Sequence, residues 1–355
     1  MKSMDNATPN ITVLGAGAWG GTLAALLNKK SYRVSMWEFS KEKAALLRKN
    51  RAMHIPGVEK FPLEIPRQIR IYDSFAEMNL TGYPTNIVVF AVPSNFLRET
   101  AKRFNEAACF NPAGTFFVSA TKGLETRTLK TMSRIITEEI KTPEGNVCVL
   151  SGPSFAIEVA RRISTAVVVA SKNEKASRFI QKAFLTDYFR VYTQTDVTGV
   201  EMGGSLKNIF AIACGISDGM GMGDNTKAAL ITRGMKEFVH LATILGAKAS
   251  TMFGLSGIGD LMTTCFSKHS RNRMLGEMVG KGIKPLDALK RIGAVAEGYL
   301  TTESAYRLGK KHNIELPIIN EAYHVLYKNK KPAESIRGLM TRQPKSEMQG
   351  QRASW

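Results

Sequence analysis

Short apolar runs alternate with segments of helical periodicity through the first half of the chain. The first run is ITVL at Ile11–Leu14, followed by a glycine-rich turn and an amphipathic stretch through Lys30. This alternation is typical of a parallel sheet covered by helices on both faces. Further strands are expected at Arg33–Trp37, Asn86–Pro93, Thr115–Gly123, Val147–Pro153, Thr165–Ala170 and Phe189–Thr193, with helices at Asn95–Asn105 and Thr126–Ile140.

The pattern changes after about Thr195. Apolar residues then recur at helical spacing over long stretches, and no clear strand-like run remains. We therefore expect the second half to be all helical. The clearest helical stretches are Ile209–Cys214, Ala228–Leu245, Leu275–Val279, Thr301–Leu308 and Glu321–Tyr327.

The turn after the first strand carries the pattern GxGxxG at Gly15, Gly17 and Gly20. It follows a strand and opens a helix, as the dinucleotide-binding fingerprint requires, whereas the pattern alone could be any glycine-rich turn. Glu38 ends the second strand, where a carboxylate can accept hydrogen bonds from a ribose 2′-OH and repels a 2′-phosphate. This favours NAD(H) over NADP(H), which stays an alternative. Glu38 could instead be an exposed loop residue.

Together these patterns predict an α/β Rossmann-type N-terminal domain and an all-α C-terminal domain. The length of 355 residues suits two domains. The expected limits are 8–196 for the NAD(P)-binding domain, 197–340 for the helical substrate-binding domain, and 341–355 for a disordered basic tail.

The chain is strongly basic, with 49 Lys and Arg against 30 Asp and Glu and a net charge of +19. Such an excess attracts anions. Because the basic residues are spread along the chain and no nucleic-acid motif occurs, we expect no nucleic-acid partner. Weak association with an anionic membrane surface stays open. With no apolar run of the ~18–20 residues that span a bilayer and a polar N-terminus, the expected location is cytoplasmic.

Cysteine and histidine usage argues against disulfides and metals. The four cysteines are scattered with no CxxC pair, so reduced and mostly buried thiols are expected. The five histidines show no metal-ligand spacing, so no metal is expected.

Several charged residues lie in glycine-rich or apolar surroundings. Lys122, in ATKG, and the turn SGPSFA both follow sheet strands, where ligands of open α/β sheets bind. Lys207, amid small and apolar residues, would have a pKa lowered toward the range of proton transfer. Asp260 could balance a nearby ammonium. In SRNR, Ser270 is expected to cap a helix and Arg271 to grip a phosphate, although each of these residues could simply be solvated.

These motifs together resemble one family. GAGAWG, ATKG, SGPSFA, the Lys207–Asn208 pair, GIGDL, SRNR and VAEG occur in the order found in NAD(P)-dependent glycerol-3-phosphate dehydrogenase. The resemblance extends from Ile11 to about Leu339. It implies reversible reduction of dihydroxyacetone phosphate to sn-glycerol 3-phosphate, a precursor of glycerophospholipids, and a homodimer.

The resemblance also assigns residues to roles. Lys207 matches the proton-transfer lysine, with Lys122 and Asp260 beside it as the other expected catalytic residues. The expected substrate-binding residues are Lys122, Gly152, Ser154, Lys207, Asp260, Ser270, Arg271 and Asn272. The expected cofactor-binding residues are Gly15, Gly17, Ala18, Trp19, Gly20, Glu38, Phe39, Phe96, Lys122, Ala156, Arg271, Val295 and Glu297.

Two other functions compete with this interpretation. Another dehydrogenase of the same two-domain plan could act on a hydroxyacid or hydroxyacyl thioester, although such families use different loops where ATKG and SRNR stand here. A non-enzymatic binder of nucleic acid or anionic membranes would account for the charge but has no recognisable motif. Glu38 departs from many bacterial relatives of the family, which lack an acid there and accept NADPH.

Overall fold

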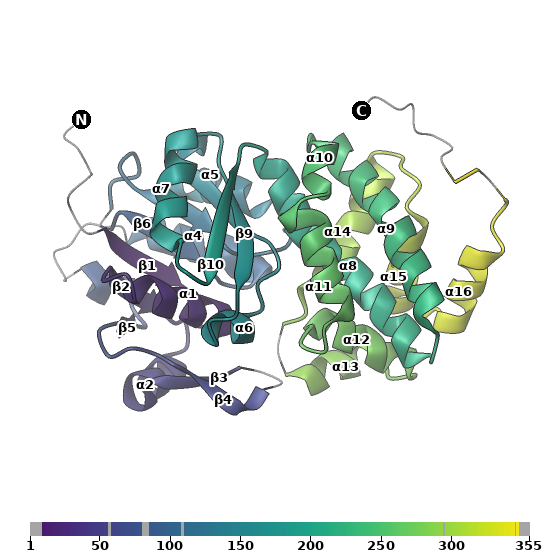
Figure 1. Ribbon diagram of the computed structural model, residues 1–355, viewed down its shortest axis with the longest axis horizontal. Helices are drawn as coiled ribbons and strands as arrows, with labels where there is room; N and C mark the ends of the chain where they lie inside the picture. Colours follow the sequence, from purple (N-terminus) through teal and green to yellow (C-terminus); the bar gives the residue numbers. More distant parts are fainter. Residues whose placement is uncertain are drawn as a thin grey trace.

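Eight strands form one sheet in the N-terminal half of the chain (Figure 1). The computed structural model describes residues 9–55, 58–79, 85–107, 110–293, 295–344 and 346–347. The strand order is β10-β9-β8-β7-β6-β1-β2-β5, and a separate hairpin pairs β3 with β4. The strands are β1 (Asn10–Leu14), β2 (Arg33–Trp37), β3 (Ala52–Ile55), β4 (Val58–Glu64), β5 (Arg70–Tyr72), β6 (Ile87–Phe90), β7 (Phe116–Ser119), β8 (Val147–Ser151), β9 (Thr165–Ala170) and β10 (Phe189–Gln194).

The sheet is parallel from β5 to β8, as the alternation predicts. The last two strands correct that prediction, because β9 runs antiparallel to β8, and β10 is parallel to β9. An apolar run indicates that a strand is buried on both faces, but it does not indicate whether that strand runs parallel or antiparallel to its neighbour. The direction follows from how the chain returns from β8 to β9, which is a tertiary property.

Helices cover both faces of the sheet. Apolar side chains of α1, α2, α6 and α7 pack on one face, and those of α3, α4 and α5 pack on the other. On α4, Leu97, Ala101 and Phe104 share the buried side because residues three and four apart lie on one helix face. These helices are α1 (Ala18–Asn28), α2 (Lys41–Asn50), α3 (Phe75–Asn79), the 3₁₀ turn η1 (Ser94–Phe96), α4 (Leu97–Glu106), α5 (Met132–Ile140), the 3₁₀ turn η2 (Glu144–Asn146), α6 (Ala156–Ala160) and α7 (Glu174–Phe184).

The helix predicted at Thr126–Ile140 is wrong over its first part. The segment before α5 is a tight loop closed by an isolated bridge between Leu124 and Thr131, and α5 begins only at Met132. Leu124 packs in the core of the helical half instead of on the sheet. A contact with another domain therefore determines the shape of this segment. The β3–β4 hairpin and β5 were not predicted, since their short, charge-interrupted runs give no clear alternation.

The C-terminal half is built around the long central helix α8 (Figure 1). Most side chains of α8 are buried, because helices surround it on several sides. No strand occurs among the described residues after β10, in agreement with the prediction. The helices are α8 (Val197–Gly219), α9 (Asp224–Ile244), α10 (Ala249–Met252), the segment η3 (Leu255–Gly259), which is kinked at Gly257, α11 (Asp260–Phe266), α12 (Arg271–Gly280), α13 (Pro285–Ile292), α14 (Glu297–Lys311), α15 (Pro317–Tyr327) and α16 (Pro332–Met340).

The last helix ends at Met340, and Arg342 then forms an ion pair with Glu315. Most of the basic tail predicted for 341–355, and the polar N-terminus before Pro9, lie outside the described residues. None of the described helices combines the length and the apolarity that crossing a membrane would require.

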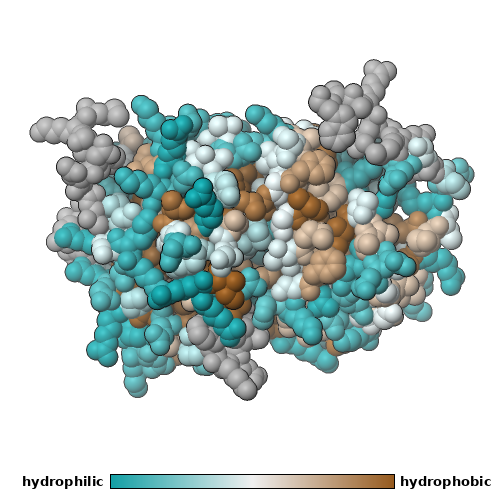
Figure 2. Space-filling view, in the orientation of Figure 1, coloured by the Kyte–Doolittle hydropathy of each residue, from teal (hydrophilic) through white to brown (hydrophobic). Residues whose placement is uncertain are grey.

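The surface is mixed in character. Figure 2 shows hydrophilic residues over much of one face and hydrophobic residues gathered over parts of the helical half. Exposed large apolar side chains of that half include Phe253, Met262 and Phe266.

Candidate functional site

Two lysines and one aspartate meet where the sheet contacts the helical half. Lys207 lies on α8, Asp260 begins α11, and Lys122 follows β7. The Nζ atom of Lys122 donates to Oδ2 of Asp260 at 2.6 Å, and Nζ of Lys207 donates to Oδ1 of the same carboxylate. Asp260 is only 2% exposed, so its charge is shielded from water and directed at the two ammonium groups. The structure thus brings together residues 53 to 138 positions apart in the sequence.

Burial changes the proton affinity of Lys207. Removal of its ammonium from water lowers the pKa, the charge of Asp260 opposes that shift, and the positive charge of Lys122 adds to it, so that the pKa falls to about 8. A lysine with a pKa near neutrality can both give and take a proton under physiological conditions.

Both ammonium groups have further partners that hold them in place. Lys207 also donates to the Thr264 hydroxyl at 2.8 Å, and that hydroxyl donates to the Asp260 carbonyl one turn earlier on α11 at 2.6 Å. Lys122 also donates to the carbonyl of Gly152 at 3.0 Å. Gly152 has a φ of +136°, and a side chain there would lie 2.9 Å from the Cα of Val167. Glycine at this position therefore shapes the turn that presents its carbonyl to Lys122.

The β1–α1 turn has the shape of an anion cradle. A Cβ atom on Gly17 would meet no atom within 4 Å, so a ligand has open access to the backbone there. A Cβ on Gly20 would lie 1.9 Å from the carbonyl oxygen of Gly15, which explains why only glycine fits. No side chain caps the start of α1, and no acid lies in its first turn. Its free N–H groups, including those of Ala18 and Trp19, and its positive dipole end suit a pyrophosphate. Ala156 begins α6, which lies beside α1 in the fold. The carbonyl oxygen of Ala156 lies 3.5 Å from the hydroxyl of Thr22 on α1.

Large apolar side chains stand exposed around this turn. Phe39 after β2 is 70% exposed, Phe96 at the start of α4 is 55% exposed, and Val295 before α14 is 38% exposed. Exposed rings beside a polar cradle are expected where a flat ligand covers them. Glu38 is half-buried, and its Oε1 accepts a hydrogen bond from the Ser40 N–H at 3.1 Å.

Glu297 connects the two halves of the chain near the same turn. Its carboxylate accepts hydrogen bonds from the N–H of Ser94 at 3.0 Å and from the Ser94 hydroxyl at 2.5 Å. Burial raises the pKa of Glu297, whereas the bonds from Ser94 and the charge of Arg271 oppose that shift. The side chain of Arg271 is exposed to solvent. The protein around its guanidinium still removes part of its hydration, which lowers its pKa, whereas the charge of Glu297 opposes that shift.

The start of α12 is ordered by two polar residues. The Ser270 hydroxyl accepts from the N–H of Arg273 at 3.2 Å, which confirms that Ser270 caps this helix. The side chain of Asn272 donates to Asn208 and accepts from the N–H of Gly298, both at 2.9 Å. Since Asn208 follows Lys207 on α8, these bonds tie α12 and α14 to the lysine helix.

Other predicted residues have a local role in the structure. The Ser154 hydroxyl donates to the Gly152 carbonyl at 2.9 Å, within its own turn. Sequence reasoning missed Thr264 and Ser94. Thr264 stands four residues after Asp260, a spacing that places both on one side of a helix, but Ser94 gave no comparable signal.

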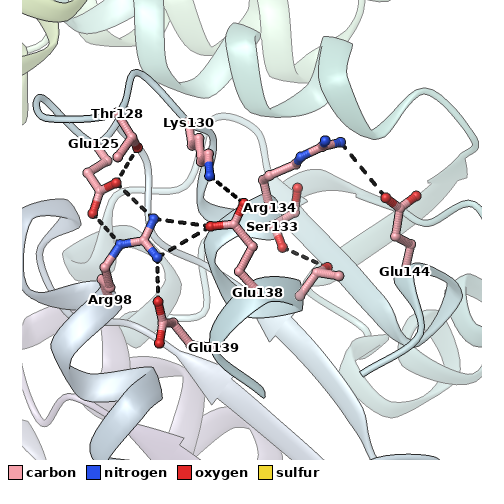
Figure 3. Close-up of polar contacts among 10 residues, drawn as sticks. Arg98, Glu125, Thr128, Lys130, Ser133, Arg134, Glu138, Glu139 and Glu144 are labelled. Atoms are coloured by element: carbon pink, nitrogen blue, oxygen red, sulfur yellow. Dashed lines mark hydrogen bonds and ion pairs between the residues drawn. The ribbon is translucent and has the colours of Figure 1, made fainter. Parts of the chain in front are cut away.

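A second charge cluster supports the loop that follows Lys122. Figure 3 shows Arg98 of α4 pointing into a group of three carboxylates. Its guanidinium binds Glu125 through two bonds of 2.6 and 2.9 Å, and contacts Glu138 and Glu139 of α5. On the opposite side, Arg307 of α14 donates to the carbonyl of Thr126. The loop is therefore held from both halves of the chain.

Possible metal ligands and thiols in the described part of the chain have a simple distribution. There, no three His, Cys, Asp or Glu side chains gather into a group that could hold a metal ion. Cys148, Cys214 and Cys265 are buried free thiols, as expected, and Cys109 lies outside the described residues.

A parallel sheet with a glycine-rich β1–α1 turn, joined to a helical half that buries a lysine at the boundary, defines a two-domain dehydrogenase of the Rossmann class. Family models described as the N-terminus and the C-terminus of NAD-dependent glycerol-3-phosphate dehydrogenase match residues 10–177 and 196–337. The chain belongs to the NAD-dependent glycerol-3-phosphate dehydrogenase family, and is thus an oxidoreductase.

Individual relatives agree with this assignment. Glycerol-3-phosphate dehydrogenase [NAD(P)+] of a Thermoanaerobacter species is 46% identical over 96% of this chain and 99% of the relative. The enzyme of the same name from Fusobacterium nucleatum is 43% identical, over 96% and 98%. The crystal structure of glycerol-3-phosphate dehydrogenase from Coxiella burnetii is 33% identical, with a TM-score of 0.86 over 94% of this chain and 99% of that one.

A D-mandelate dehydrogenase shares the fold alone. It is 12% identical with a TM-score of 0.61, and the match covers 92% of this chain and 99% of that one. This likeness concerns the fold and carries no information about the substrate of this chain.

Proposed function

We propose that the chain catalyses the reversible NAD(P)H-dependent reduction of dihydroxyacetone phosphate to sn-glycerol 3-phosphate, which supplies glycerophospholipid synthesis. The observation that carries this proposal is the buried Lys207–Asp260–Lys122 cluster in a member of this family. It provides a proton donor with a tuned pKa at the boundary of a nucleotide-binding half and a helical half.

The residues around the β1–α1 turn fit a nicotinamide dinucleotide. The open space at Gly17 and the uncapped start of α1 suit its pyrophosphate, and Glu38 suits its ribose. When bound, NAD(P)H supplies the hydride. Because Glu38 would repel a 2′-phosphate, we infer a preference for NAD(H). The proposed binding residues are Gly15, Gly17, Ala18, Trp19, Gly20, Glu38, Phe39, Phe96, Lys122, Ala156, Arg271, Val295 and Glu297.

Lys207 is the proposed proton donor. Its Nζ atom carries a proton that it would deliver to the ketone oxygen of the substrate, where negative charge develops during reduction. Lys122 lies on the other side of Asp260 and would stabilise the same oxygen. Asp260 supplies the counter-charge without which the buried ammonium of Lys207 and the partly buried ammonium of Lys122 would repel one another.

The other end of the substrate carries a phosphate. Arg271 can bind it through two parallel N–H groups, with Asn272 and Ser270 beside it on α12. Gly152 and Ser154 form the turn next to Lys122 and complete the proposed substrate site. Binding energy from the phosphate would then orient the reacting carbon toward Lys207.

Further proposals concern the whole protein. We infer a homodimer and a cytoplasmic location with weak affinity for anionic membranes, which the net charge of +19 supports. The domain limits 8–196 and 197–340 are likewise proposed as the units that bind nucleotide and substrate.

The test is the absorbance of reduced nicotinamide at about 340 nm with purified protein and dihydroxyacetone phosphate. We expect rapid oxidation of NADH and slower oxidation of NADPH. Equal rates with both would remove the preference assigned to Glu38. A folded protein that binds cofactor but oxidises neither would overturn the substrate assignment.

A further inference from the structure

Helices α8 and α12 lie side by side with their backbones in contact (Figure 1). Two glycines of each helix face the other helix, and a Cβ atom on any of them would lie 2.0 to 2.3 Å from a backbone carbonyl oxygen there. Helices usually resist sliding because side-chain ridges fit into grooves, and glycines provide no ridge. The position of α12 along α8 must therefore be fixed by other groups. The glycines are Gly215 and Gly219 on α8, and Gly276 and Gly280 on α12.

An ion pair beside this contact connects the two helices. The Nε atom of Arg273 on α12 donates to Oδ2 of Asp218 on α8 at 2.7 Å, and its Nη2 atom lies 2.7 Å from the same oxygen. Lys227 of α9 pairs with the other oxygen of Asp218 at 2.6 Å. The three side chains are only 12% to 14% exposed, so water screens their attraction weakly. The pair between Asp218 and Arg273 therefore holds α12 at one position along α8.

The proposed reacting group and the proposed phosphate-binding groups lie on these same two helices. Lys207 belongs to α8, whereas Arg271 and Asn272 begin α12. Asn272 binds Asn208, the residue after Lys207, at 2.9 Å. A shift of α12 along α8 would thus move the phosphate end of the site relative to Nζ of Lys207. In dihydroxyacetone phosphate a single CH₂–O link separates the ketone carbon from the phosphate, so the substrate permits only one such spacing.

We propose that the Asp218–Arg273 pair sets the spacing between Lys207 and the phosphate-binding residues, and thereby selects substrates whose ketone and phosphate are this far apart. The inference rests on the proposed function and its substrate. Arg273 is a positioning residue, because it acts through Arg271 and Asn272, its neighbours on α12. A displacement of about 1 Å between a bound substrate and a catalytic group can cost about a hundredfold in rate, so a small shift of α12 is sufficient.

The experiment compares dihydroxyacetone phosphate with dihydroxyacetone, which has the same ketone but no phosphate. Values of kcat/KM with NADH are measured for wild type and for Arg273→Met, which keeps the apolar stem and lacks the guanidinium. We expect kcat/KM for dihydroxyacetone phosphate to fall by about tenfold to a hundredfold, and that for dihydroxyacetone to change by less than about twofold. Loss of folded protein would lower both values alike, so their ratio reports positioning.

Changes at the partner residue test the pair itself. Asp218→Asn should lower the ratio as Arg273→Met does, and the double variant should lower it no further, because both changes break the same contact. Arg273→Lys should recover part of the ratio, since an ammonium can still pair with Asp218.

The matched control is Lys227→Met. It removes the other cation from the same carboxylate but leaves α8 and α12 connected through Arg273, so the ratio should stay within about twofold of wild type. A second control is the inhibition constant of inorganic phosphate. A free anion needs no second point of attachment, so Arg273→Met should change this constant by less than about twofold.

Three outcomes would overturn this inference alone. Equal losses with both ketones would mean that Arg273 supports the helical half as a whole. A matching rise in the inhibition constant of phosphate would mean that Arg273 binds the anion itself. An equal effect of Lys227→Met would assign the role to charge rather than to the connection between α8 and α12. A wild type that binds NADH but reduces neither ketone would instead overturn the proposed function, and this inference with it.

Discussion

At the residue scale, the chemistry of the site depends on how three charges share one buried space. Burial removes water from the ammonium of Lys207 and lowers its pKa, so that its proton is easier to remove. The negative charge of Asp260 opposes this shift and favours the charged ammonium. Lys122 adds a second positive charge to the same carboxylate. The three side chains therefore act as one group, and the effects of changing two of them will not add.

The first prediction concerns Lys207→Met. We expect the turnover number for reduction to fall by about a thousandfold or more, because the proton donor and the charge next to the developing oxyanion are both lost. Binding of NADH should change little. Lys290→Met is the control, since Lys290 is a largely exposed lysine of α13. Steady-state kinetics and nucleotide titration check this, and near-normal turnover would exclude Lys207 from the mechanism.

The second prediction is the pH profile of kcat/KM. Reduction needs Lys207 protonated, so its kcat/KM should fall as pH rises through the pKa of about 8, while that for oxidation of glycerol 3-phosphate should rise through the same region. Two profiles of opposite sign with a common inflection are expected. Parallel profiles in the two directions would show that another group controls the proton.

At the scale of helices and loops, buried carboxylates on one element cap the start of another. Glu237 of α9 accepts from the N–H groups of Ile318 and Ile319 at 2.8 and 3.1 Å, at the start of α15. Glu201 of α8 accepts from Ser133 at the start of α5 in the same way. These N–H groups have no partner within their own helix, so each carboxylate satisfies donors that would otherwise be buried unpaired.

The third prediction follows from the cap by Glu237. Burial raises the pKa of Glu237 to about 7, above its unfolded value of 4.5, so the folded state holds a proton that the unfolded state releases. The stabilisation is present below about pH 4.5 and is lost as pH rises through about 7. The unfolding free energy of wild type relative to Glu237→Gln should therefore fall by about 3 kcal/mol over this range.

Urea unfolding at several pH values measures this difference. Glu334→Gln, an exposed residue in the first turn of α16, is the control and should show no such trend. A difference that is constant with pH would mean that Glu237 does not titrate in this window.

The fourth prediction concerns the cluster around Arg98 (Figure 3). Arg98→Ala leaves Glu125, Glu138 and Glu139 without their shared cation, and we expect a loss of about 1–3 kcal/mol of unfolding free energy. Arg98→Lys should recover only part, because an ammonium cannot bind Glu125 through two parallel bonds. Arg178→Ala, which breaks an exposed pair with Glu174, should cost less than about 0.5 kcal/mol. Equal losses for both arginines would contradict this account.

At the scale of the whole molecule, polar contacts join the two halves on both sides of the lysine cluster. Ser94 binds Glu297, Ser205 donates to the Gly123 carbonyl at 3.1 Å, and Lys122 reaches Asp260. Each joins a loop after a sheet strand to a helix of the C-terminal half. The site therefore exists only when the two halves are docked, and stability and function should change together.

The fifth prediction tests this coupling with Ser94→Ala, Glu297→Gln and the double variant. Each single change should cost about 1–2 kcal/mol of unfolding free energy, and the double variant should cost less than their sum, because both remove the same buried contact. Ser250→Ala, an exposed serine of α10, is the control. Strictly additive losses in urea unfolding would show that Ser94 and Glu297 act independently.

The sequence alone determined the class of fold and much of the composition of the site. The alternation of apolar runs, the glycine fingerprint and the helical second half all depend on local periodicity and backbone sterics, which neighbouring residues dictate. Ser270 could be predicted as a helix cap for the same reason. The family followed from motifs such as ATKG and SRNR, whose order is itself a property of the sequence.

Only the tertiary structure decided features that depend on contacts between distant segments. The antiparallel entry of β9, the loop at 124–131 in place of the start of a helix, and the sharing of Asp260 by Lys122 and Lys207 are of this kind. The same holds for the pairing of Arg273 with Asp218. Periodicity reports which face of an element is buried, whereas strand direction, loop shape and charge pairing depend on what that face meets.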